Sequence, residues 1–321
     1  MKSFSSNGKL LLTGEYVVLD GALSLAVPTK FGQSLTVEAI SEPKIIWKSL
    51  DEKGNIWFED IFFLEEIATS PTPRNDISNR LVQILIAAKQ LNPDFLKTET
   101  GFKVSTKLDF PKNWGLGTSS TLINNVAQWA SIDAYKLLEN TFGGSAYDIA
   151  CAQNDTPITY QLKPFDLLRK VLSMKKYFHF TNAQGDRQIK KSHFNPSFKE
   201  HLYFVHLNKK QNSRDGIKHY NANKGNLNAV ISSINDITLK MIACNHLSEF
   251  ENLIAQHETI IGKITKQTPV KVLLFNDFKG SIKSLGAWGG DFVLVASKEN
   301  PESYFKAKGF ETIIPYTKMI L

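Results

Sequence analysis

Residues 111–121, PKNWGLGTSST, bring together residue types that can bind a phosphate group. The glycines Gly115 and Gly117 allow backbone N–H groups to approach a phosphate closely, and a helix that begins after them adds unpaired donors and a favourable dipole. The hydroxyl groups of residues 118–121 can cap that helix or reach a cation bound to the phosphate. The stretch alone fits a capped helix after a turn equally well, so its function depends on the rest of the chain.

Three other segments carry residues with a similar potential. They are residues 7–16 (NGKLLLTGEY), 143–150 (GGSAYDIA) and 284–291 (SLGAWGGD). Taken one at a time, each has a plain structural explanation: an exposed lysine on a strand, a capped helix after a turn, and a tight turn before a strand. Other nucleotide motifs are missing, since the sequence has no Walker P-loop, no complete dinucleotide fingerprint and no protein-kinase motif set.

The four segments, in this order and spread over nearly the whole chain, resemble motifs of the GHMP kinase superfamily, which includes galactokinase, homoserine kinase, mevalonate kinase and phosphomevalonate kinase. Residues 14–19, GEYVVL, are closest to the phosphomevalonate kinase branch, where G-E-Y-x-V-L is typical. Mevalonate kinases and galactokinases usually carry a histidine after the glutamate. Residues 146–150, AYDIA, are also nearer to the phosphomevalonate kinase branch. The closest overall resemblance is to a bacterial subgroup with a GYDIA-like signature.

The resemblance implies roles for individual residues. Asp148 would orient or deprotonate the acceptor oxygen, and Lys9 would stabilise the transferred phosphoryl group and help to keep Asp148 ionised. Ser119 would bind Mg²⁺, and it belongs to the implied ATP-binding set, which is Gly115, Leu116, Gly117, Thr118, Ser119 and Ser120. The implied substrate-binding set is Glu15, Tyr16, Ser145, Ser213, Gly286, Gly289 and Gly290.

Several positions depart from the superfamily pattern. Asn7 replaces the proline of the first motif, and Thr118 and Ser120 are mild substitutions in the second. Ala146 stands where a glycine is usual beside the catalytic aspartate, and Trp288 replaces a glycine of the third motif. The last two departures keep open a non-catalytic nucleotide-binding regulator with the same fold.

The implied reaction is transfer of the γ-phosphoryl group of Mg·ATP to a small hydroxyl or phosphate acceptor. We expect phosphomevalonate as the first acceptor and mevalonate as the second, which would place the protein in isoprenoid-precursor synthesis. A lyase of the diphosphomevalonate decarboxylase type is the enzymatic alternative. Ser213, together with Lys209 and Arg214, could hold a phosphate or carboxylate of the substrate, although a polar surface loop explains these residues equally well.

Composition limits the remaining classes of protein. The 321 residues carry a formal net charge of +7, which suits an anionic acceptor such as a phosphorylated one, and the short basic pairs lack a nucleic-acid-binding signature. No apolar run is long enough for a membrane span and no signal peptide is recognisable, so we expect a cytoplasmic protein without nucleic-acid or membrane partners. Cys151 and Cys244 are the two cysteines, which indicates free thiols, and dispersed histidines argue against a zinc site. The sequence leaves the oligomeric state open.

The elements that must position these residues mix strands and helices without a regular βαβ repeat, which favours an α+β fold. We expect strands at 9–12, 16–19, 34–40, 102–108, 202–207, 270–274 and 292–296, and a strand pair around Trp47 and Trp57. Helices are expected at about 77–90, from the 111–121 loop to just before Gly143, and at 227–243 and 247–261. The polar stretch 180–200 is the best candidate boundary. The resemblance implies an ATP-binding N-terminal domain (1–195) like domain 2 of ribosomal protein S5, and a ferredoxin-like C-terminal domain (196–321).

Overall fold

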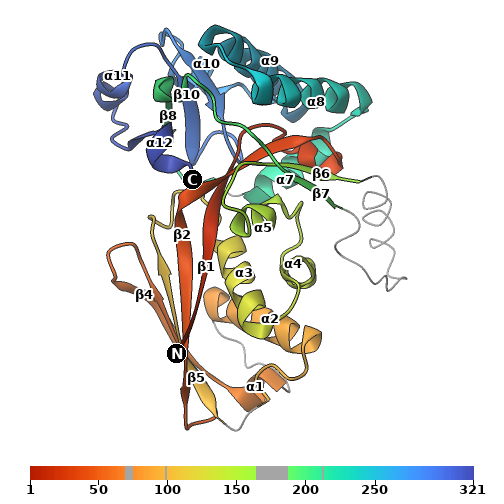
Figure 1. The fold of residues 1–321 in the computed structure, drawn as a ribbon, viewed down its shortest axis with the longest axis vertical. Coiled ribbons are helices and arrows are strands. Elements are labelled where there is room, and N and C mark those ends of the chain that lie inside the picture. Colours follow the sequence, from red (N-terminus) through yellow and green to blue (C-terminus); the bar gives the residue numbers. More distant parts are fainter. Residues whose placement is uncertain (69–74, 98–99, 164–186, 212) are drawn as a thin grey trace. The chain divides into compact units, whose positions relative to one another are not determined.

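The computed structural model describes residues 1–68, 75–97, 100–163, 187–211 and 213–321. Helices and strands are mixed along the chain, and the strands form two separate sheets (Figure 1). The fold class is therefore α+β, as the sequence predicts. Residues 180–186 of the expected boundary lie outside the described residues. The domain boundary at residue 195 therefore stays a prediction.

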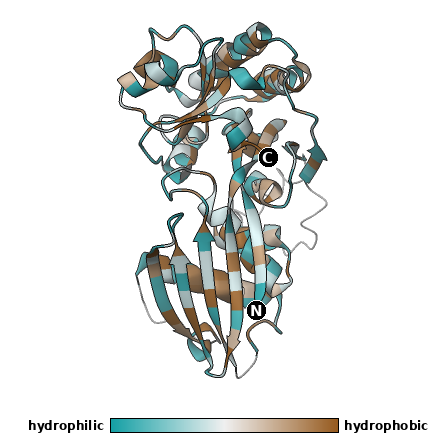
Figure 2. Cartoon of the chain, turned by 60° about the vertical axis from the view of Figure 1, so that its left-hand side comes forward, coloured by the Kyte–Doolittle hydropathy of each residue, from teal (hydrophilic) through white to brown (hydrophobic). Residues whose placement is uncertain are grey.

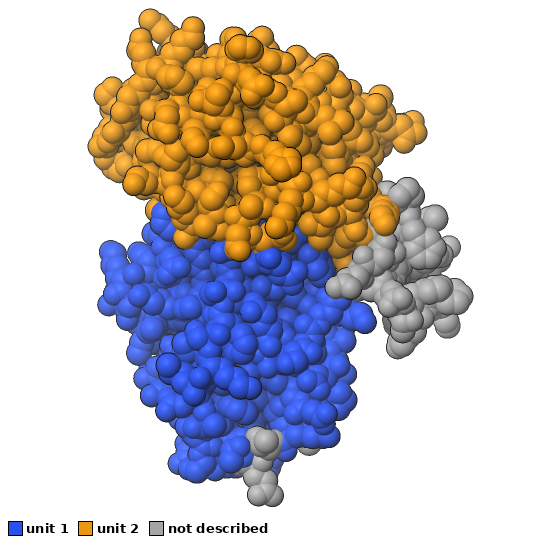
Figure 3. All heavy atoms as spheres, in the orientation of Figure 1, with its two compact units in different colours: residues 1–8, 31–112, 116–153 blue, residues 9–30, 113–115, 154–321 orange. Residues whose placement is uncertain are grey.

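The chain divides into two compact units that are interleaved along the sequence (Figure 3). Unit 1 contains Met1–Gly8, Phe31–Lys112 and Leu116–Gln153, and unit 2 contains Lys9–Lys30, Asn113–Gly115 and Asn154–Leu321. Within the glycine-rich loop, residues 113–115 thus belong to unit 2, and the residues on either side of them belong to unit 1.

Unit 1 is built on a mixed sheet. Its strands are β4 (Ile56–Phe63), β3 (Lys44–Leu50), β5 (Gly101–Leu108) and the later part of β2 (Ser24–Ile40), hydrogen-bonded in that order. β3 pairs antiparallel with β4 and parallel with β5, and β5 pairs antiparallel with β2. Buried and half-exposed residues alternate along β3, and apolar and polar residues alternate along the strands of this sheet (Figure 2). β1 (Lys2–Leu11) also pairs with β2.

The helices of unit 1 lie on one face of this sheet (Figure 1). They are α1 (Leu64–Ala68), α2 (Asp76–Leu91), α3 (Thr118–Ala130), α4 (Ala134–Thr141) and α5 (Tyr147–Ala152), and α3 contacts α2, α4 and α5. The side chain of Asn75 caps α2 by accepting hydrogen bonds from two backbone N–H groups of its first turn. The single helix expected up to Gly143 is wrong, because Ser131 with a φ of 55° ends α3 and the Asp133 side chain caps a separate α4.

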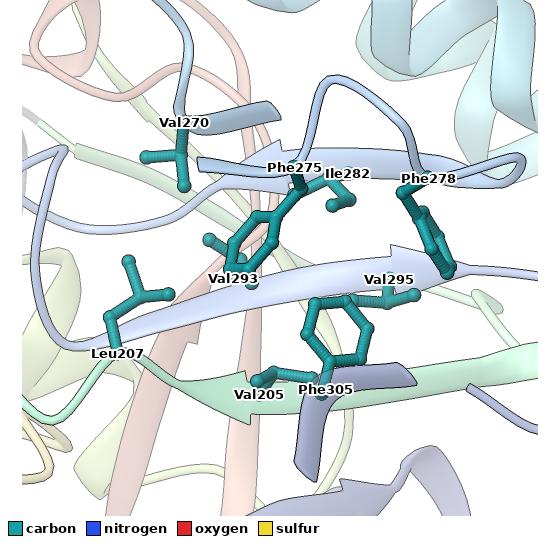
Figure 4. Close-up of a cluster of buried hydrophobic side chains, with 9 residues drawn as sticks. All are labelled: Val205, Leu207, Val270, Phe275, Phe278, Ile282, Val293, Val295 and Phe305. Carbon is teal, nitrogen blue, oxygen red and sulfur yellow. The ribbon is translucent and has the colours of Figure 1, made fainter. Parts of the chain in front are cut away.

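Unit 2 contains an antiparallel sheet with the order β11 (Ile313–Pro315), β8 (Leu202–His206), β10 (Phe292–Ala296) and β9 (Ser281–Ser284). A cluster of buried apolar side chains packs around this sheet (Figure 4): Val205, Leu207, Val270, Phe275, Phe278, Ile282, Val293, Val295 and Phe305. These residues come from strands, helices and loops between residues 205 and 305, and they pack against one another as one core.

The helices of unit 2 are α7 (Ser213–Asn223), α8 (Asn228–Ala243), α9 (Leu247–Thr265), α10 (Val270–Leu274), α11 (Glu302–Ala307) and α12 (Tyr316–Met319). α8 contacts α9, and α9 contacts β9. β6 (Ile158–Leu162) and β7 (Arg187–Lys191) form an antiparallel pair, and β6 also pairs with the first residues of β2.

Two strands expected from the sequence are wrong. Residues 17–20 form a short 3₁₀ helix, because Tyr16 and Gly21 at its ends both have positive φ and turn the chain. Residues 270–274 form α10, in which two backbone N–H groups donate to the Pro269 carbonyl and three consecutive apolar side chains are exposed. An apolar run of this length fits a strand or a helical turn equally well, and here local hydrogen bonds decide.

The other expected elements are confirmed. β1 and β2 begin earlier than predicted, while β3 to β5, α2, α8, α9, β8 and β10 agree closely with the predicted ranges. Cys151 and Cys244 are both buried and free, as expected. Over the residues that the structure describes, no helix is long and apolar enough to cross a membrane.

Candidate functional site

The N-terminus of α3 offers backbone donors that no protein group uses. Its N-cap residue, Gly117, has a φ of 97° and provides no side-chain oxygen for the helix. The backbone N–H groups of Thr118, Ser119 and Ser120 therefore have no acceptor among the described residues. Such a helix end, with free N–H groups and a positive dipole end, is suited to binding an anion.

The hydroxyl groups of this first turn differ in what they contact. Ser120 Oγ donates to the Gly117 carbonyl at 2.8 Å, so that hydroxyl is already used within the turn. The hydroxyls of Thr118 and Ser119 make no hydrogen bond with any described residue, and Ser119 is the exposed one of the two. The Ser119 hydroxyl is therefore available to a ligand or a cation, whereas Ser120 can offer its backbone N–H.

These residues are compatible with Mg²⁺ carried by a nucleotide. Within the described ranges, no three histidine, cysteine, aspartate or glutamate side chains gather where they could hold a metal ion. Mg²⁺ bound with a nucleotide needs only one or two protein ligands, because phosphate oxygens and water supply the others. The exposed Ser119 hydroxyl beside free backbone donors fits that requirement.

Residues 113–115 of the glycine-rich loop are held by contacts within unit 2. The carbonyl of Asn113 lies 3.1 Å from His206 Nε2, and the Trp114 ring packs edge-on against Phe292 with centroids 5.4 Å apart. Lys9 Nζ donates to the Gly115 carbonyl at 3.1 Å. Two of the segments singled out in the sequence, residues 7–16 and 111–121, are thus joined by a direct hydrogen bond.

The third segment, residues 284–291, is an unusual backbone loop. Gly286 and Gly289 have φ of 60° and 79°, which glycine adopts without strain, but Trp288 and Asp291 also have positive φ, 46° and 54°. A Cβ on Gly290 would lie 2.9 Å from the carbonyl oxygen of Lys209, so this position needs glycine for close packing. The backbone N–H groups of residues 286–290 donate to no other described residue. This loop is a second place where an anion could meet free backbone donors.

Residues 14–16 of the first segment are buried in unit 2. The Gly14 N–H donates to His257 Nε2 at 3.0 Å, and a Cβ on Gly14 would collide with Ser24 Oγ at 2.1 Å. Glu15 is 1% exposed and forms an ion pair with Lys283, which is completely buried. The Lys283 ammonium group also lies 4.0 Å from Glu258 Oε1.

One buried ammonium group therefore serves two buried carboxylates. Burial raises the pKa of Glu15, and the positive charge of Lys283 only partly offsets that effect. Burial likewise raises the pKa of Glu258 to about 7, again against the influence of Lys283. Burial and Lys283 both hold the pKa of His257 well below its ordinary value, so the ring is neutral and accepts from Gly14 through Nε2.

Tyr16 is held in a strained conformation against α7. Its φ is 65°, and its ring stacks on Tyr220 with centroids 5.4 Å apart. The Tyr16 hydroxyl is buried without a partner among the described residues, and burial raises the pKa of Tyr16 to about 12. Tyr220 in turn donates to Asp20 at 2.6 Å, and a Cβ on Gly216 would lie 2.6 Å from the Tyr16 hydroxyl.

Asp148 is the second residue of α5 in unit 1, and its side chain is half-buried. The residue before α5, Ala146, has a φ of 69°, so it adopts a conformation typical of glycine in spite of its Cβ. Ser145 is 6% exposed. The turn before α5 therefore forms with alanine at position 146, where a glycine would adopt the same φ with less strain.

Comparison with solved structures identifies the fold. No family model and no curated protein matches the sequence. A phosphomevalonate kinase from Streptococcus pneumoniae, solved with phosphomevalonate and AMPPNP, is similar over 100% of this chain and 98% of that chain, with a TM-score of 0.67 and 16% identity. The mevalonate kinase of Methanococcus jannaschii is similar over 97% and 96%, with a TM-score of 0.69 and 16% identity. The chain has the GHMP kinase fold.

A third similar structure widens the range of activities within this fold. A Lactococcus lactis galactokinase, solved with galactose, is similar over 98% of this chain and 93% of that chain, with a TM-score of 0.64 and 13% identity. The GHMP kinase fold explains the mixed N-terminal sheet, the antiparallel C-terminal sheet and their covering helices. At these identities the similarity concerns the fold alone.

The predicted site residues divide between the two units of the GHMP kinase fold. In unit 2, the structure joins Lys9 to Gly115 and places Glu15 and Tyr16 in one buried region. The loop glycines Gly286, Gly289 and Gly290 also belong to unit 2, whereas the members found in unit 1 are Leu116, Gly117, Thr118, Ser119, Ser120, Ser145 and Asp148. The pairing of Lys9 with Asp148 stays a prediction, as does every ligand contact. Ser213 begins α7, and its side chain lies outside the described residues.

Four charged or titratable residues near these positions were missed from the sequence. They are His257, Glu258, Lys283 and Asp291, all in unit 2. Lys283 directly precedes the third segment and Asp291 is its last residue, so their position at a glycine-rich loop was a usable signal. No sequence signal pointed to His257 or Glu258, because they lie in the middle of an amphipathic helix, α9.

Proposed function

We propose that this protein is an ATP-dependent small-molecule kinase that transfers the γ-phosphoryl group of ATP to a hydroxyl or phosphate acceptor. The observation that carries the proposal is the uncapped N-terminus of α3, which follows a glycine loop held by Lys9, in a chain with the GHMP kinase fold. Free backbone donors and an ammonium group are features that phosphoryl transfer uses.

Each group has a role in this proposal. The N–H groups at the start of α3 would bind phosphate oxygens of ATP, and Ser119 would hold Mg²⁺, which neutralises phosphate charge when bound. Lys9 would stabilise the negative charge that develops on the transferred phosphoryl group. Asp148 would orient the acceptor oxygen and accept a proton where the acceptor is a hydroxyl. Tyr16, Ser145 and the glycines of the third segment would contact the acceptor.

For the acceptor we propose phosphomevalonate first and mevalonate second. The similar structures include a phosphomevalonate kinase solved with phosphomevalonate and a mevalonate kinase solved with mevalonate, and the net charge of +7 suits an anionic substrate. A Ser213 side chain beside Lys209 and Arg214 would then meet the acceptor phosphate or carboxylate. The proposed place of action is isoprenoid-precursor synthesis in the cytoplasm.

The test is ADP release by the purified protein with Mg·ATP and a panel of phosphomevalonate, mevalonate, homoserine and galactose. Acceptor-dependent release with one compound is the expected result, and release with none of them contradicts the proposed substrate class. Asp148→Asn should lower turnover by roughly 10²- to 10⁴-fold while the affinity for AMPPNP is retained. Asp155→Asn, which changes an exposed aspartate, is the matched control and should leave both quantities unchanged. Release of CO₂ from diphosphomevalonate would instead support the lyase of the same superfamily.

A nucleotide-binding regulator without turnover is the second candidate, and Trp288 favours it. The Trp288 side chain is 2% exposed, and its indole N–H is buried without a partner among the described residues. At this position, where a glycine is usual, the Trp288 side chain would restrict the backbone conformations of the third segment. AMPPNP binding measured by calorimetry, together with no ADP release for any acceptor, would support this candidate.

A further inference from the structure

Asp291 closes the third segment, and several segments of unit 2 meet at its carboxylate. A Cβ on Gly115 would lie 2.4 Å from Asp291 Cγ, so the loop backbone packs directly against the carboxylate. A Cβ on Gly286 would lie 3.6 Å from Oδ2, and the backbone N–H of Gln211 lies 3.4 Å from Oδ1. Asp291 is only 9% exposed, so its carboxylate has little contact with water.

The backbone of Asp291 is fixed on both sides. Its N–H donates to the Lys209 carbonyl at 2.6 Å, and its carbonyl accepts from the Leu207 N–H at 2.7 Å. These bonds continue the antiparallel pairing in which Phe292 opposes His206. The φ of 54° lies in the left-handed region, which aspartate tolerates better than most residues. The β8–β10 ladder therefore fixes the direction in which the Asp291 side chain leaves the backbone.

The charges around this carboxylate are positive. Burial raises the pKa of Asp291, and the charges of Lys9, Lys210 and His206 oppose that rise, with Lys9 the strongest of the three. Lys9 Nζ also donates to the carbonyl of Gly115, the residue whose backbone packs against the carboxylate. Lys9, Gly115 and Asp291 thus form one cluster, and the proposed mechanism gives the carboxylate no part.

We propose that Asp291 is a positioning residue that holds the Lys9 ammonium group against the Gly115 carbonyl. This inference rests on the proposed kinase function, in which Lys9 must keep one orientation beside the phosphate-binding loop. A lysine side chain has many rotamers, and a charged partner on a fixed backbone restricts them. Asp291 acts through Lys9 and makes no contact with nucleotide or acceptor.

Asp291→Asn tests the proposal, because asparagine keeps the shape, loses the charge and tolerates the left-handed backbone. Reductive methylation with ¹³C-formaldehyde gives an NMR signal for each lysine, and Lys9→Arg assigns the Lys9 signal. We expect Asp291→Asn to move the Lys9 signal toward those of exposed lysines and to lower ADP release from Mg·ATP by about 10- to 100-fold. The affinity for Mg·AMPPNP should change by less than about threefold. The reason is that the interaction of Asp291 with Lys9 is proposed to affect turnover more than nucleotide binding.

The matched control is Asp277→Asn, which removes an exposed carboxylate that pairs with Lys308. It should leave the Lys9 signal and ADP release as in the wild type. If Asp291→Asn fails to fold, Gly115→Ala places a methyl group against the carboxylate and should move the Lys9 signal instead.

An unmoved Lys9 signal in the folded variant overturns the proposal, whatever happens to ADP release. A moved signal with unchanged ADP release overturns it as well, because the interaction between the two charges would then have no part in turnover. A wild-type protein that binds no AMPPNP refutes the kinase function itself, and any role of Asp291 in the reaction is refuted with it. The Lys9 signal reports the influence of the Asp291 charge in that case too, so the two failures are distinguishable.

Discussion

Replacing Lys283 by methionine should destabilise unit 2 strongly. Lys283 is completely buried, and its ammonium group forms the ion pair with Glu15 and lies 4.0 Å from Glu258 Oε1. Methionine fills a similar volume, so packing is largely kept while two buried carboxylates lose their positive partner. Removing one partner of a buried ion pair costs about 3–5 kcal/mol, a large part of the total of about 5–15 kcal/mol that is usual for folded domains.

Hydrogen exchange read by mass spectrometry measures this loss in unit 2 separately. The amides of α9 and β9, which carry Glu258 and Lys283, should exchange roughly 10²- to 10⁴-fold faster in Lys283→Met, since about 1.36 kcal/mol corresponds to one factor of ten. A single urea transition is a weaker assay, because a chain with two compact units need not unfold in one step. Lys306→Met is the control, since Lys306 pairs with Glu302 on the exposed surface of α11 and should leave exchange unchanged.

The pH dependence of the variant sharpens the test. Without Lys283, both carboxylates become still harder to ionise, so their pKa values in the folded protein rise further above the unfolded ones. A group with a raised folded pKa contributes stability at low pH and loses it as the pH rises through that pKa. The deficit of Lys283→Met relative to the wild type should therefore be smaller at pH 5 than at pH 8. Equal exchange rates in variant and wild type, or a deficit independent of pH, would refute the electrostatic reasoning.

Three further variants test other parts of the structure. The wild type should lose roughly 3 kcal/mol of stability as the pH rises from the ordinary Glu258 pKa of 4.5 to about 7, and Glu258→Gln should remove that loss, as read from the hydrogen exchange of the α9 amides at both pH values. Ala146→Gly should stabilise the protein by about 0.5–1 kcal/mol in thermal unfolding, because it relieves a φ of 69°; a lower melting temperature would contradict the strain. Ser119→Ala should reduce ADP release by at least about tenfold with an unchanged melting temperature, since its hydroxyl is exposed, and unaltered release would exclude Ser119 as the Mg²⁺ ligand.

Local signals predicted much of the fold, including the glycine-rich loop and the helix that follows it. Gly117, the hydroxyl cluster and the apolar periodicity after it lie within a few positions of each other, so they predicted α3 and its free N-terminus. The same local reasoning failed at residues 270–274, where an apolar run has no periodicity that separates strand from helix. It failed also after Ala130, where one left-handed residue divides a helical pattern.

The charged cluster could not be predicted because its members are far apart in sequence. Glu15 and Lys283 are separated by 268 positions, and the sequence around either residue alone does not indicate a buried charge. Glu15 was assigned to the substrate on resemblance, and that role stays a prediction beside the observed ion pair with Lys283. The position of Asp291 against Gly115 likewise depends on the β8–β10 pairing, which no local pattern specifies.

The separation between Glu15 and Lys283 also constrains how the protein is made. Unit 1 is complete once Gln153 has been synthesised, whereas unit 2 needs β9 and β10 from the last part of the chain. At about 5–20 residues per second, the ribosome needs roughly 15–50 s to add the 268 residues that follow Glu15 up to and including Lys283. During that time the first segment is expected to remain in water or with a chaperone, because burying an unpaired carboxylate costs free energy. Synthesis that stops before Lys283 should therefore yield a nascent chain with a folded first unit and an unfolded second one.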